Sequence, residues 1–587
     1  MKSKLFFKII LTAFCIVFIE NVNAQTPYWL WTKSIGGKKS DAARSIVVDP
    51  GNGDVFATGS FTGTVDFDPG ESTFNLSSTG SSSIYIAKID GSGNFVWAKR
   101  LGGKDVAYVL SIALDPSGIG NIYITGSFQG TVDFDPGPDT FDLISAGTSD
   151  IFIAHLDGSG NFLWAKAMGG PDAVYVSSIA IDQAGSGEVY IAGYFRGTVD
   201  FDPSPLSFPL TSVGNDDVFI AKLDGAGNFA WTKSFGGTGS DVSRCMALDP
   251  AGNGGVYTTG MFSGTVDFDP GLNSSNITSV GNFDIFISKL DDSGNFVWAK
   301  QLGGAGDKNG SGTSITIEPT NGNIYATGYF EGTADFDPGK GIVELTSSGR
   351  RDIFISKLDR RGNLLWAKAI GGTKLDAGGS IAVDPTGTGD VYTTGYFHGI
   401  VDFDPGPGSF HLASVGPDDI FISKLDDSGN FEWVKTISGT KEEAANTIAL
   451  DALGHVYVGG FFNGPTISFD SCILINAESS LGTADIFIAK LDLLTASFNN
   501  VDHKSQTLDV YPNPVKDRLI IKLAEEELHD VKITLYDSKG EVVFRRVVDT
   551  GSNEYNIDFS GLPASTYIVE VDVNGNKMVE QIVKAEE

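Results

Sequence analysis

The residues of this sequence whose type and spacing could support chemistry are six Asp-x-Asp pairs. Each pair belongs to a repeated phrase, Gly-Thr-Val-Asp-Phe-Asp-Pro or a close variant of it. In an extended chain, carboxylates at positions i and i+2 point to the same side, so one pair could offer its oxygens to a single Ca²⁺. Calcium is therefore the one cofactor that the sequence suggests, and the candidate ligands are Asp66, Asp68, Asp133, Asp135, Asp200, Asp202, Asp267, Asp269, Asp335, Asp337, Asp402 and Asp404.

The same pairs also have a purely structural interpretation. An Asp-x-Asp-Pro phrase can end a strand and cap a turn, because the carboxylates accept hydrogen bonds from backbone N–H groups. Two carboxylates supply few of the roughly six to eight ligands of Ca²⁺, and no stretch of the sequence has the pattern of an EF-hand loop. Most repeats carry one more acid before their first strand, and we expect these acids to share a rim with the pairs: Asp41, Asp105, Asp172, Asp241, Asp307 and Asp376.

The sequence assigns no catalytic residue. Its six histidines share no spacing, and it contains no Gly-x-Ser-x-Gly elbow, His-Glu-x-x-His motif or phosphate loop. His155 replaces the Lys found at the same point of the other repeats. An active site could still be assembled from loops of different repeats, but it would need polar residues particular to one or two of them.

The elements that must position all these residues come from a repeat of 66 to 68 residues. Each copy predicts four short antiparallel strands, for example 45–49, 55–61, the Asp-Ile-Phe-Ile-Ser-Lys-Leu-Asp segment at 352–359, and a strand carrying a Trp. Four strands per unit, repeated seven times, are typical of an all-β seven-bladed β-propeller. We expect the small-residue first strand to be innermost and the Trp strand outermost, and the seven markers are Trp31, Trp97, Trp164, Trp231, Trp298, Trp366 and Trp433.

The two ends of the repeat region are complementary. The region begins with a fourth-strand phrase at 28–33 and ends with a third-strand phrase at 485–492. The next Trp is due at position 499, where the sequence has Asn499 instead. We therefore predict that the N-terminal strand completes the last blade and closes the ring.

The repeat resembles the bacterial propeller repeat often called SBBP, and the resemblance covers roughly residues 28–494. A WD40 repeat fits less well, because its period is about 40 to 45 residues. The SBBP resemblance implies the propeller fold and leaves the activity open.

Both ends of the chain indicate export. Residues 1–24 have lysines, an apolar run and a Val22-Asn23-Ala24 cleavage site, as in a signal peptide. Residues 25–494 would form the propeller, 495–507 a linker, and 508–587 a small Ig-like β-sandwich. The last segment opens with Tyr511-Pro512-Asn513-Pro514 and contains a Gly-Leu-Pro-Ala-Ser-Thr-Tyr phrase at 561–567. It resembles the type A C-terminal sorting domain of the type IX secretion system of Bacteroidetes, which implies that the secretion machinery recognises residues 508–587 and delivers the protein to the cell surface or the medium.

The net charge of the chain disfavours some classes of binding partner. The chain has 41 basic and 73 acidic residues, a net charge of −32, which argues against nucleic acid and against docking on anionic lipid. After signal removal no segment is long and apolar enough to predict a membrane-spanning helix. We expect a monomer that binds an extracellular glycan, a protein or a cation.

The leading hypothesis is an exported, cell-surface or released, non-enzymatic binding or adhesion module. One alternative is a hydrolase or lyase that acts on an extracellular polysaccharide, and another is a structural spacer of a surface layer. An enzyme predicts pKa-shifted groups at one or two blades, whereas a binding module predicts repeated weak sites or one exposed aromatic patch.

Overall fold

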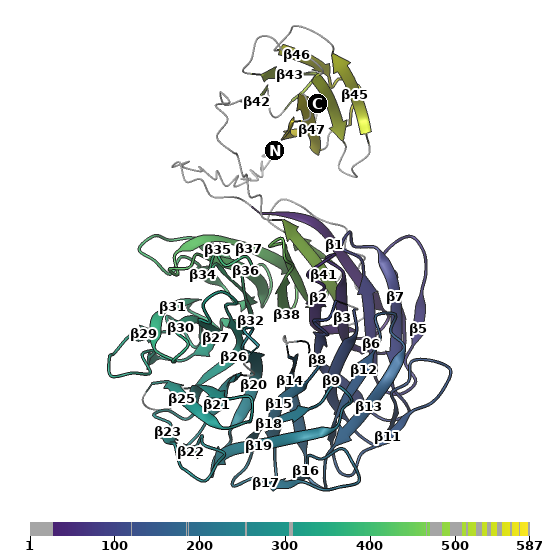
Figure 1. Ribbon diagram of the computed structural model, residues 1–587. Coiled ribbons are helices and arrows are strands. Elements are labelled where there is room, and N and C mark those ends of the chain that lie inside the picture. The colour runs from purple at the N-terminus through teal and green to yellow at the C-terminus, as the bar shows by residue number, and fades with distance from the viewer. Residues whose placement is uncertain are drawn as a thin grey trace, which may run out of the picture. The chain divides into compact units, whose positions relative to one another are not determined.

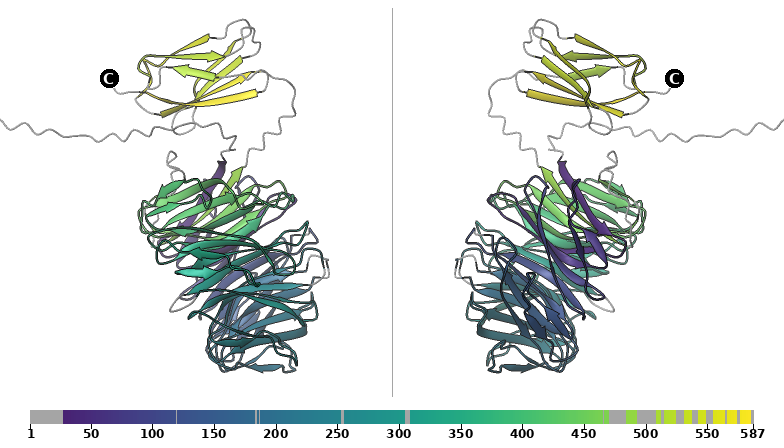
Figure 2. Two further views of the ribbon diagram at one scale, coloured as in Figure 1. Left: turned by 90° about the vertical axis from the view of Figure 1, so that its left-hand side faces the viewer. Right: turned by 90° about the vertical axis from the view of Figure 1, so that its right-hand side faces the viewer.

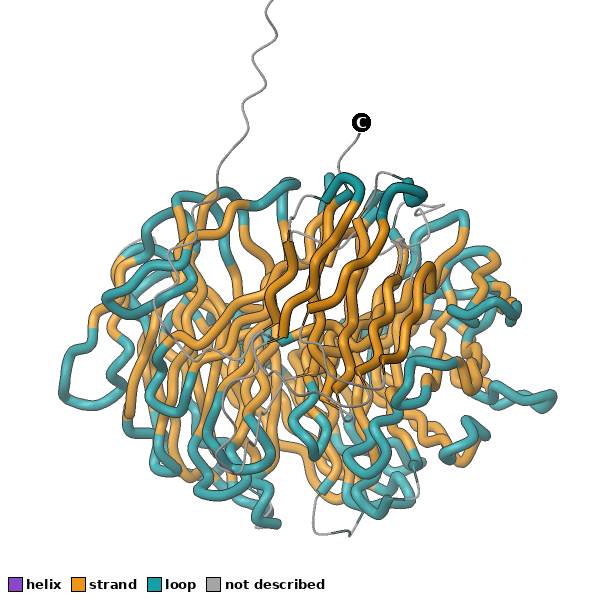
Figure 3. The backbone as a smooth tube through the Cα atoms, turned by 90° about the horizontal axis from the view of Figure 1, so that it is seen from above, coloured by secondary structure: helices purple, strands orange, loops and turns teal. Residues whose placement is uncertain are grey.

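The computed structural model describes residues 27–118, 120–182, 185, 187–252, 255–304, 309–464, 466–469 and 484–492, and in the C-terminal part 508–511, 515–523, 531–536, 542–548, 554–563, 566–573 and 576–584. The chain divides into two units, Met1–Leu494 and Thr495–Glu587, which are considered separately. The described residues consist of strands and loops, as Figure 3 shows.

The first unit is a seven-bladed β-propeller, which confirms the predicted fold class. Seven antiparallel sheets surround one axis (Figure 1), and Figure 2 shows the ring from two sides. The innermost strands are β2 (Ala42–Val48), β8 (Ala107–Leu114), β14 (Val174–Ile181), β20 (Val242–Leu248), β26 (Gly310–Ile317), β32 (Ala377–Val383) and β38 (Glu443–Leu450). The second strands are β3 (Val55–Phe61), β9 (Ile122–Phe128), β15 (Val189–Phe195), β21 (Val256–Phe262), β27 (Ile324–Phe330), β33 (Val391–Phe397) and β39 (Val456–Phe462).

Two more strands complete each blade. The third strands are β6 (Ser83–Ile89), β12 (Asp150–Leu156), β18 (Asp217–Leu223), β24 (Asp284–Leu290), β30 (Asp352–Leu358), β36 (Asp419–Leu425) and β41 (Asp485–Asp492). The fourth strands carry the repeated Trp and are β7 (Phe95–Leu101), β13 (Phe162–Met168), β19 (Phe229–Gly237), β25 (Phe296–Leu302), β31 (Leu364–Gly372), β37 (Phe431–Gly439) and, for the last blade, β1 (Tyr28–Gly37).

The core lies between the blades. Because side chains alternate along a strand, each blade presents two apolar faces and packs one against each neighbour. In β6, Ile84 and Ile86 belong to the cluster shared with the second blade, whereas Tyr85, Ala87 and Ile89 belong to the cluster shared with the seventh. Alternate residues of a strand are thus buried on opposite faces of the blade.

The N-terminal strand closes the ring, as the offset of the repeat predicted. β1 pairs with β41 along its length, with Trp31 opposite Lys490 and Ile35 opposite Ile486. The side chain of Ile35 is only 2% exposed within the core shared by the last and first blades.

Neighbouring blades are linked by a short two-stranded ribbon that was not predicted from the sequence. The connection between the second and third strands of a blade extends the fourth strand of the preceding blade; in the first blade, Asp66 and Val65 pair with Gly36 and Gly37 of β1. The Trp strand is the outermost of the four strands of its blade, as expected, and the ribbon adds further strands beyond its end. The ribbons are β4 (Thr64–Asp66) with β5 (Asn75–Ser77), β10 (Thr131–Asp133) with β11 (Asp142–Ile144), β16 (Thr198–Asp200) with β17 (Pro209–Thr211), β22 (Thr265–Asp267) with β23 (Asn276–Thr278), β28 (Thr333–Asp335) with β29 (Glu344–Thr346), β34 (Ile400–Asp402) with β35 (His411–Ala413), and the single strand β40 (Ile467–Phe469).

Residue type explains the ribbon geometry. Val65 and Phe67 are fully buried, and the ring of Phe67 packs against Phe61 and Tyr85. A Cβ on Gly37 would lie 2.5 Å from the carbonyl oxygen of Thr64, so only glycine allows the ribbon to approach β1 this closely. The alternating Val and Phe of the repeated phrase thus anchor the ribbon, while the acids between them face outward.

The second unit forms two antiparallel sheets. One contains β42 (Leu508–Tyr511), β43 (Arg518–Leu523) and β46 (Glu554–Asp558). The other contains β45 (Val542–Val548), β44 (Val531–Tyr536), β47 (Thr566–Val573) and β48 (Asn576–Val583). Side chains of both sheets share one apolar core; the Ig-like topology stays a prediction. Among the described residues of the chain, no helix could span a lipid bilayer. The predicted signal peptide at 1–24 and linker at 495–507 lie outside the described residues.

Candidate functional site

The Asp-x-Asp pairs lie in the loops of the ribbons. In the first blade, Oδ1 of Asp66 accepts hydrogen bonds from the backbone N–H groups of Asp68 and Phe74 at 3.2 and 2.8 Å. Oδ1 of Asp68 accepts one from Gly70 at 2.8 Å. The same three bonds recur in the other five copies, at Asp133/Asp135, Asp200/Asp202, Asp267/Asp269, Asp335/Asp337 and Asp402/Asp404.

This arrangement gives each pair a structural role, because its carboxylates close the ribbon loop by accepting backbone N–H groups. Within the described residues, no three acidic, histidine or cysteine side chains are grouped so that they could hold a metal ion. Calcium binding by the pairs is not tested by this geometry and stays a prediction.

Calcium binding can be measured directly in solution. If the pairs bind Ca²⁺ only in the folded state, millimolar Ca²⁺ should raise the melting temperature relative to EDTA, since a ligand at 100 times its Kd adds about 2.7 kcal/mol. An Asp66→Asn, Asp68→Asn, Asp133→Asn, Asp135→Asn variant should then show a smaller shift, because four of the six pairs remain. Identical melting curves with Ca²⁺ and with EDTA would leave the pairs as turn caps.

The acids before the first strands meet the ribbon connections on one face, as expected. Oδ2 of Asp105 accepts a hydrogen bond from the backbone N–H of Thr131 at 2.9 Å, and Asp172 bonds Thr198 in the same way. Asp41 is fully buried and accepts N–H groups of Gly37 and Thr62. Asp307 lies outside the described residues. We call this side of the propeller the loop face.

Several of these buried carboxyl groups have strongly raised pKa values. Burial raises the pKa of Asp41 to about 7, and the nearby charge of Asp485 adds to the effect. Burial likewise raises the pKa of Asp241 to about 7, of Asp376 to about 6 and of Glu443 to about 8. Because the same arrangement recurs at four blade junctions, it favours a structural role over a single catalytic site.

The loop face also carries one feature that is not repeated, an exposed aromatic patch on the second and third blades. Tyr108 of β8 is 50% exposed and Tyr175 of β14 is 38% exposed. Leu110, two residues after Tyr108 on β8, is also exposed. Tyr175 pairs across the sheet with Tyr194, and the two rings stack at 5.1 Å. Strand pairing places Tyr108 and Tyr175 at equivalent positions, where the other five blades have Ala42, Val242, Ser311, Ala377 and Ala444.

Charged groups border the aromatic patch, defined as Tyr108, Leu110, Tyr175 and Tyr194. Arg196 forms an ion pair with Asp216 at 3.0 Å, and Asp216 also accepts the hydroxyl of Ser240. Burial raises the pKa of Tyr194, the charge of Arg244 lowers it and that of Asp216 raises it, so both charges act on this ring. The patch was not predicted from the sequence, although the two tyrosines depart from the Ala, Ser or Val of the other repeats.

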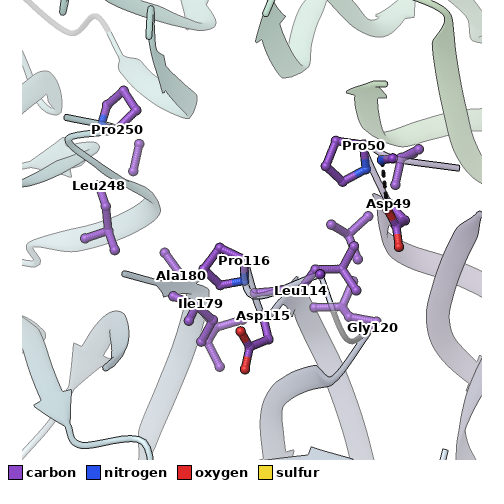
Figure 4. Close-up of a pocket in the computed structure, with 18 of the residues that line it drawn as sticks. Asp49, Pro50, Leu114, Asp115, Pro116, Gly120, Ile179, Ala180, Leu248 and Pro250 are labelled. Carbon is purple, nitrogen blue, oxygen red and sulfur yellow. Dashed lines mark hydrogen bonds between the residues drawn. The ribbon is translucent and has the colours of Figure 1, made fainter. Parts of the chain in front are cut away.

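The opposite face, where the first-to-second strand turns lie, opens onto an apolar cavity of 660 Å³. Inner-strand ends such as Leu114, Ile179 and Leu248 line it together with Pro50 and Pro116 (Figure 4). Asp49 and Asp115 also border it, and Oδ1 of each accepts a backbone N–H group of its own turn. The lining varies little from blade to blade, as expected for the end of a propeller channel.

His155 occupies the position of a repeated structural cation. In the other blades, a third-strand Lys places its ammonium 4.5 to 5.6 Å from the ring centre of a second-strand aromatic residue. The His155 ring instead stacks on Tyr123 at 3.9 Å. Burial lowers the pKa of His155 to about 4, so the imidazole is neutral at pH 7 and packs as an aromatic residue.

Comparison with known proteins assigns the C-terminal part. Residues 509–585 match the protein family described as the secretion system C-terminal sorting domain, which confirms the predicted sorting domain. The chain is 25% identical over 451 residues to the uncharacterized WD repeat-containing protein L264 of Acanthamoeba polyphaga mimivirus, which covers 64% of this chain and 32% of that protein. It is 29% identical over 112 residues to the regulatory protein FlaEY of Caulobacter vibrioides, covering 19% of this chain and 12% of FlaEY. The chain thus spans a third or less of the length of these two relatives.

Among solved structures, the chain matches the crystal structure of Sqt1 from Chaetomium thermophilum. The match has 9% identity and a TM-score of 0.35, and it covers 74% of this chain and 97% of that one. A similarity this low carries no functional argument.

Proposed function

We propose that the protein is an exported, non-enzymatic binding module that takes an extracellular glycan on the aromatic patch of its loop face. The sorting-domain match at 509–585 supports export. The proposed route begins with a signal peptide at 1–24 and ends with type IX secretion to the cell surface or the medium. An SBBP-type propeller from a member of the Bacteroidetes would fit this route.

The observation that carries the proposal is the confinement of exposed tyrosines to two of seven equivalent positions. A repeat protein that needs only to close its ring would keep the Ala, Ser or Val found at the other five. Tyr108 and Tyr175 instead expose part of their aromatic side chains. Tyr175 stacks on Tyr194, and the charge of Asp216, which is ion-paired with Arg196, acts on Tyr194. Tyrosine faces pack on the C–H face of a sugar ring, while neighbouring polar groups bond its hydroxyls.

A binding screen with matched variants tests this function. The purified protein is incubated with a panel of extracellular polysaccharides, and the same panel is offered to the double variant Tyr108→Ala, Tyr175→Ala. We expect the wild type to retain at least one polysaccharide and the double variant to bind it at least about tenfold more weakly, which corresponds to ~1.4 kcal/mol.

Phe141→Ala is the matched control, because Phe141 is 38% exposed in the turn that precedes the ribbon strand β11. It should bind as the wild type does. Absence of any retained polysaccharide, or equal retention by the double variant, would refute the proposal.

The same panel separates the alternatives. A hydrolase or lyase would release new sugar ends from the retained polymer, and a structural spacer would retain none. The repeated raised-pKa carboxyl groups, each bonded to backbone N–H groups, support the binding module over the enzyme.

A further inference from the structure

Two arginines flank the aromatic patch on the innermost strands. Around the axis the strands follow in the order β2, β8, β14, β20, with Tyr108 and Tyr175 on the middle two (Figure 1). Arg44 lies on β2 and Arg244 on β20, so one guanidinium belongs to the blade before the patch and the other to the blade after it.

Both arginines occupy the same special backbone position. Each innermost strand has a β-bulge, and Arg44 and Arg244 are the extra residues of their bulges. A bulge re-aims its side chain away from the regular alternation of the strand. In the fifth and seventh blades, the bulge residues Thr313 and Asn446 bond backbone carbonyls of the following innermost strand, and for Arg44 the following strand is β8 of the patch. Arg244 lies close enough to Tyr194 of the patch for its charge to lower the pKa of that tyrosine.

Unlike those of Arg196, Arg351 and Arg360, the side chains of Arg44 and Arg244 are not neutralised by an acid. Both are exposed, and neither forms an ion pair or a side-chain hydrogen bond within the described part of the chain. Other arginines pair with carboxylates at 3.0 to 3.1 Å, as Arg196 does with Asp216, Arg351 with Glu331 and Arg360 with Asp249. In a chain with 73 acidic and 41 basic residues, two unpaired guanidiniums beside one patch form a local departure from the overall charge.

Unpaired guanidinium groups border the patch although the protein is acidic. Asp216 is balanced by Arg196. Asp105 and Asp172 are exposed three residues before Tyr108 and Tyr175, and each accepts a hydrogen bond from a backbone N–H group of a ribbon strand. The Debye length is about 8 Å at physiological ionic strength, so acids on distant blades are largely screened at the patch. A planar guanidinium also matches a carboxylate bidentately.

We propose that the ligand of the aromatic patch is an anionic glycan whose sugar units carry carboxylates, that is, a hexuronic acid polymer. This inference rests on the proposed function and adds the charge of the ligand. The sugar rings pack on Tyr108 and Tyr175, and Arg44 and Arg244 bind uronate carboxylates on either side.

Affinity electrophoresis with paired polymers tests the inference. The purified protein is run through gels that contain polygalacturonate or alginate, and through gels that contain the carboxyl-reduced form of each polymer. We expect at least one uronate polymer to bind at least tenfold more tightly than its reduced form. The variant Arg44→Gln, Arg244→Gln should lose this preference. Higher salt should lower the affinity of the wild type for the uronate polymer until it approaches that of the variant.

Arg361→Gln is the charge-matched control, since Arg361 is exposed in the turn between β30 and β31, on the opposite face. It should keep the preference. Equal binding of a polymer and its reduced form, or a preference that survives the double arginine variant, would overturn this inference and leave the glycan-binding function standing. If neither uronate polymer binds but a neutral polysaccharide is retained in the screen, the inference is overturned and the glycan-binding function still stands. If no polysaccharide is retained in the screen, the glycan-binding function itself is refuted.

Discussion

Thermal stability of the protein should fall as the pH rises from about 5 to about 8. Asp41, Asp241, Asp376 and Glu443 have folded-state pKa values between about 6 and 8, chiefly because they are buried. In the unfolded chain these groups titrate near 4. Between pH 4 and pH 8 the folded state therefore binds more protons than the unfolded state, and raising the pH favours unfolding.

Aspartates in the turns make the stability fall again at low pH. Burial raises the pKa of Asp90, but hydrogen bonds from Asn94 and Ser92 together more than offset this effect, so its pKa is lowered; Asp157 behaves in the same way. Such groups lose their contribution when they are protonated, below pH 4. The melting temperature should accordingly be highest near pH 5, which differential scanning calorimetry across pH 4 to 8 can establish.

A pair of variants assigns this pH dependence to the blade junctions. Asp41→Asn removes one raised-pKa carboxyl group and should flatten the fall in melting temperature above pH 6. Glu71→Gln removes an exposed carboxyl group of the same blade and should leave the slope unchanged. A melting temperature that rises steadily from pH 5 to pH 8 would show that the buried carboxyl groups are ionised in the folded protein.

Truncation of Ile35 to alanine should destabilise the propeller by about 2–5 kcal/mol, the usual cost of deleting a buried aliphatic side chain. Ile35 lies on the closing strand β1 and packs into the core shared by the last and first blades. Urea unfolding followed by tryptophan fluorescence measures the change.

Leu30→Ala is the control on the same strand, because Leu30 is 41% exposed and its truncation should cost no more than about 0.5 kcal/mol. If the two variants unfold at the same urea concentration as the wild type, β1 does not close the ring.

The ring and its closure could be predicted from sequence because both depend on a strong, regular signal. The Trp markers recur at a nearly constant spacing, and the phrase at 28–33 is out of step with the repeats by three strands. Pairing of β1 with β41 is the physical result. Likewise, the structural interpretation of the Asp pairs needed only the preference of Asp carboxylates for nearby backbone N–H groups.

The ribbons and the aromatic patch could not be predicted in the same way. A ribbon strand such as Thr64–Asp66 has three residues, too few for periodicity, and its partner Gly36–Gly37 belongs to another blade. A difference in spacing concealed the patch: Asp115 lies ten positions after Asp105 in the second repeat, but Asp49 lies eight positions after Asp41 in the first. Only strand pairing shows that Tyr108 corresponds to Ala42.

Hydrogen–deuterium exchange with and without the polysaccharide retained in the screen tests the central claim most directly, because it shows where on the propeller the ligand lies. The account predicts that bound polysaccharide slows exchange at the loop-face ends of β8 and β14, around Tyr108 and Tyr175, and leaves the turns at Pro50 and Pro116 unchanged. Protection confined to those turns, around the apolar cavity, or spread equally over the six Asp-x-Asp loops would contradict it.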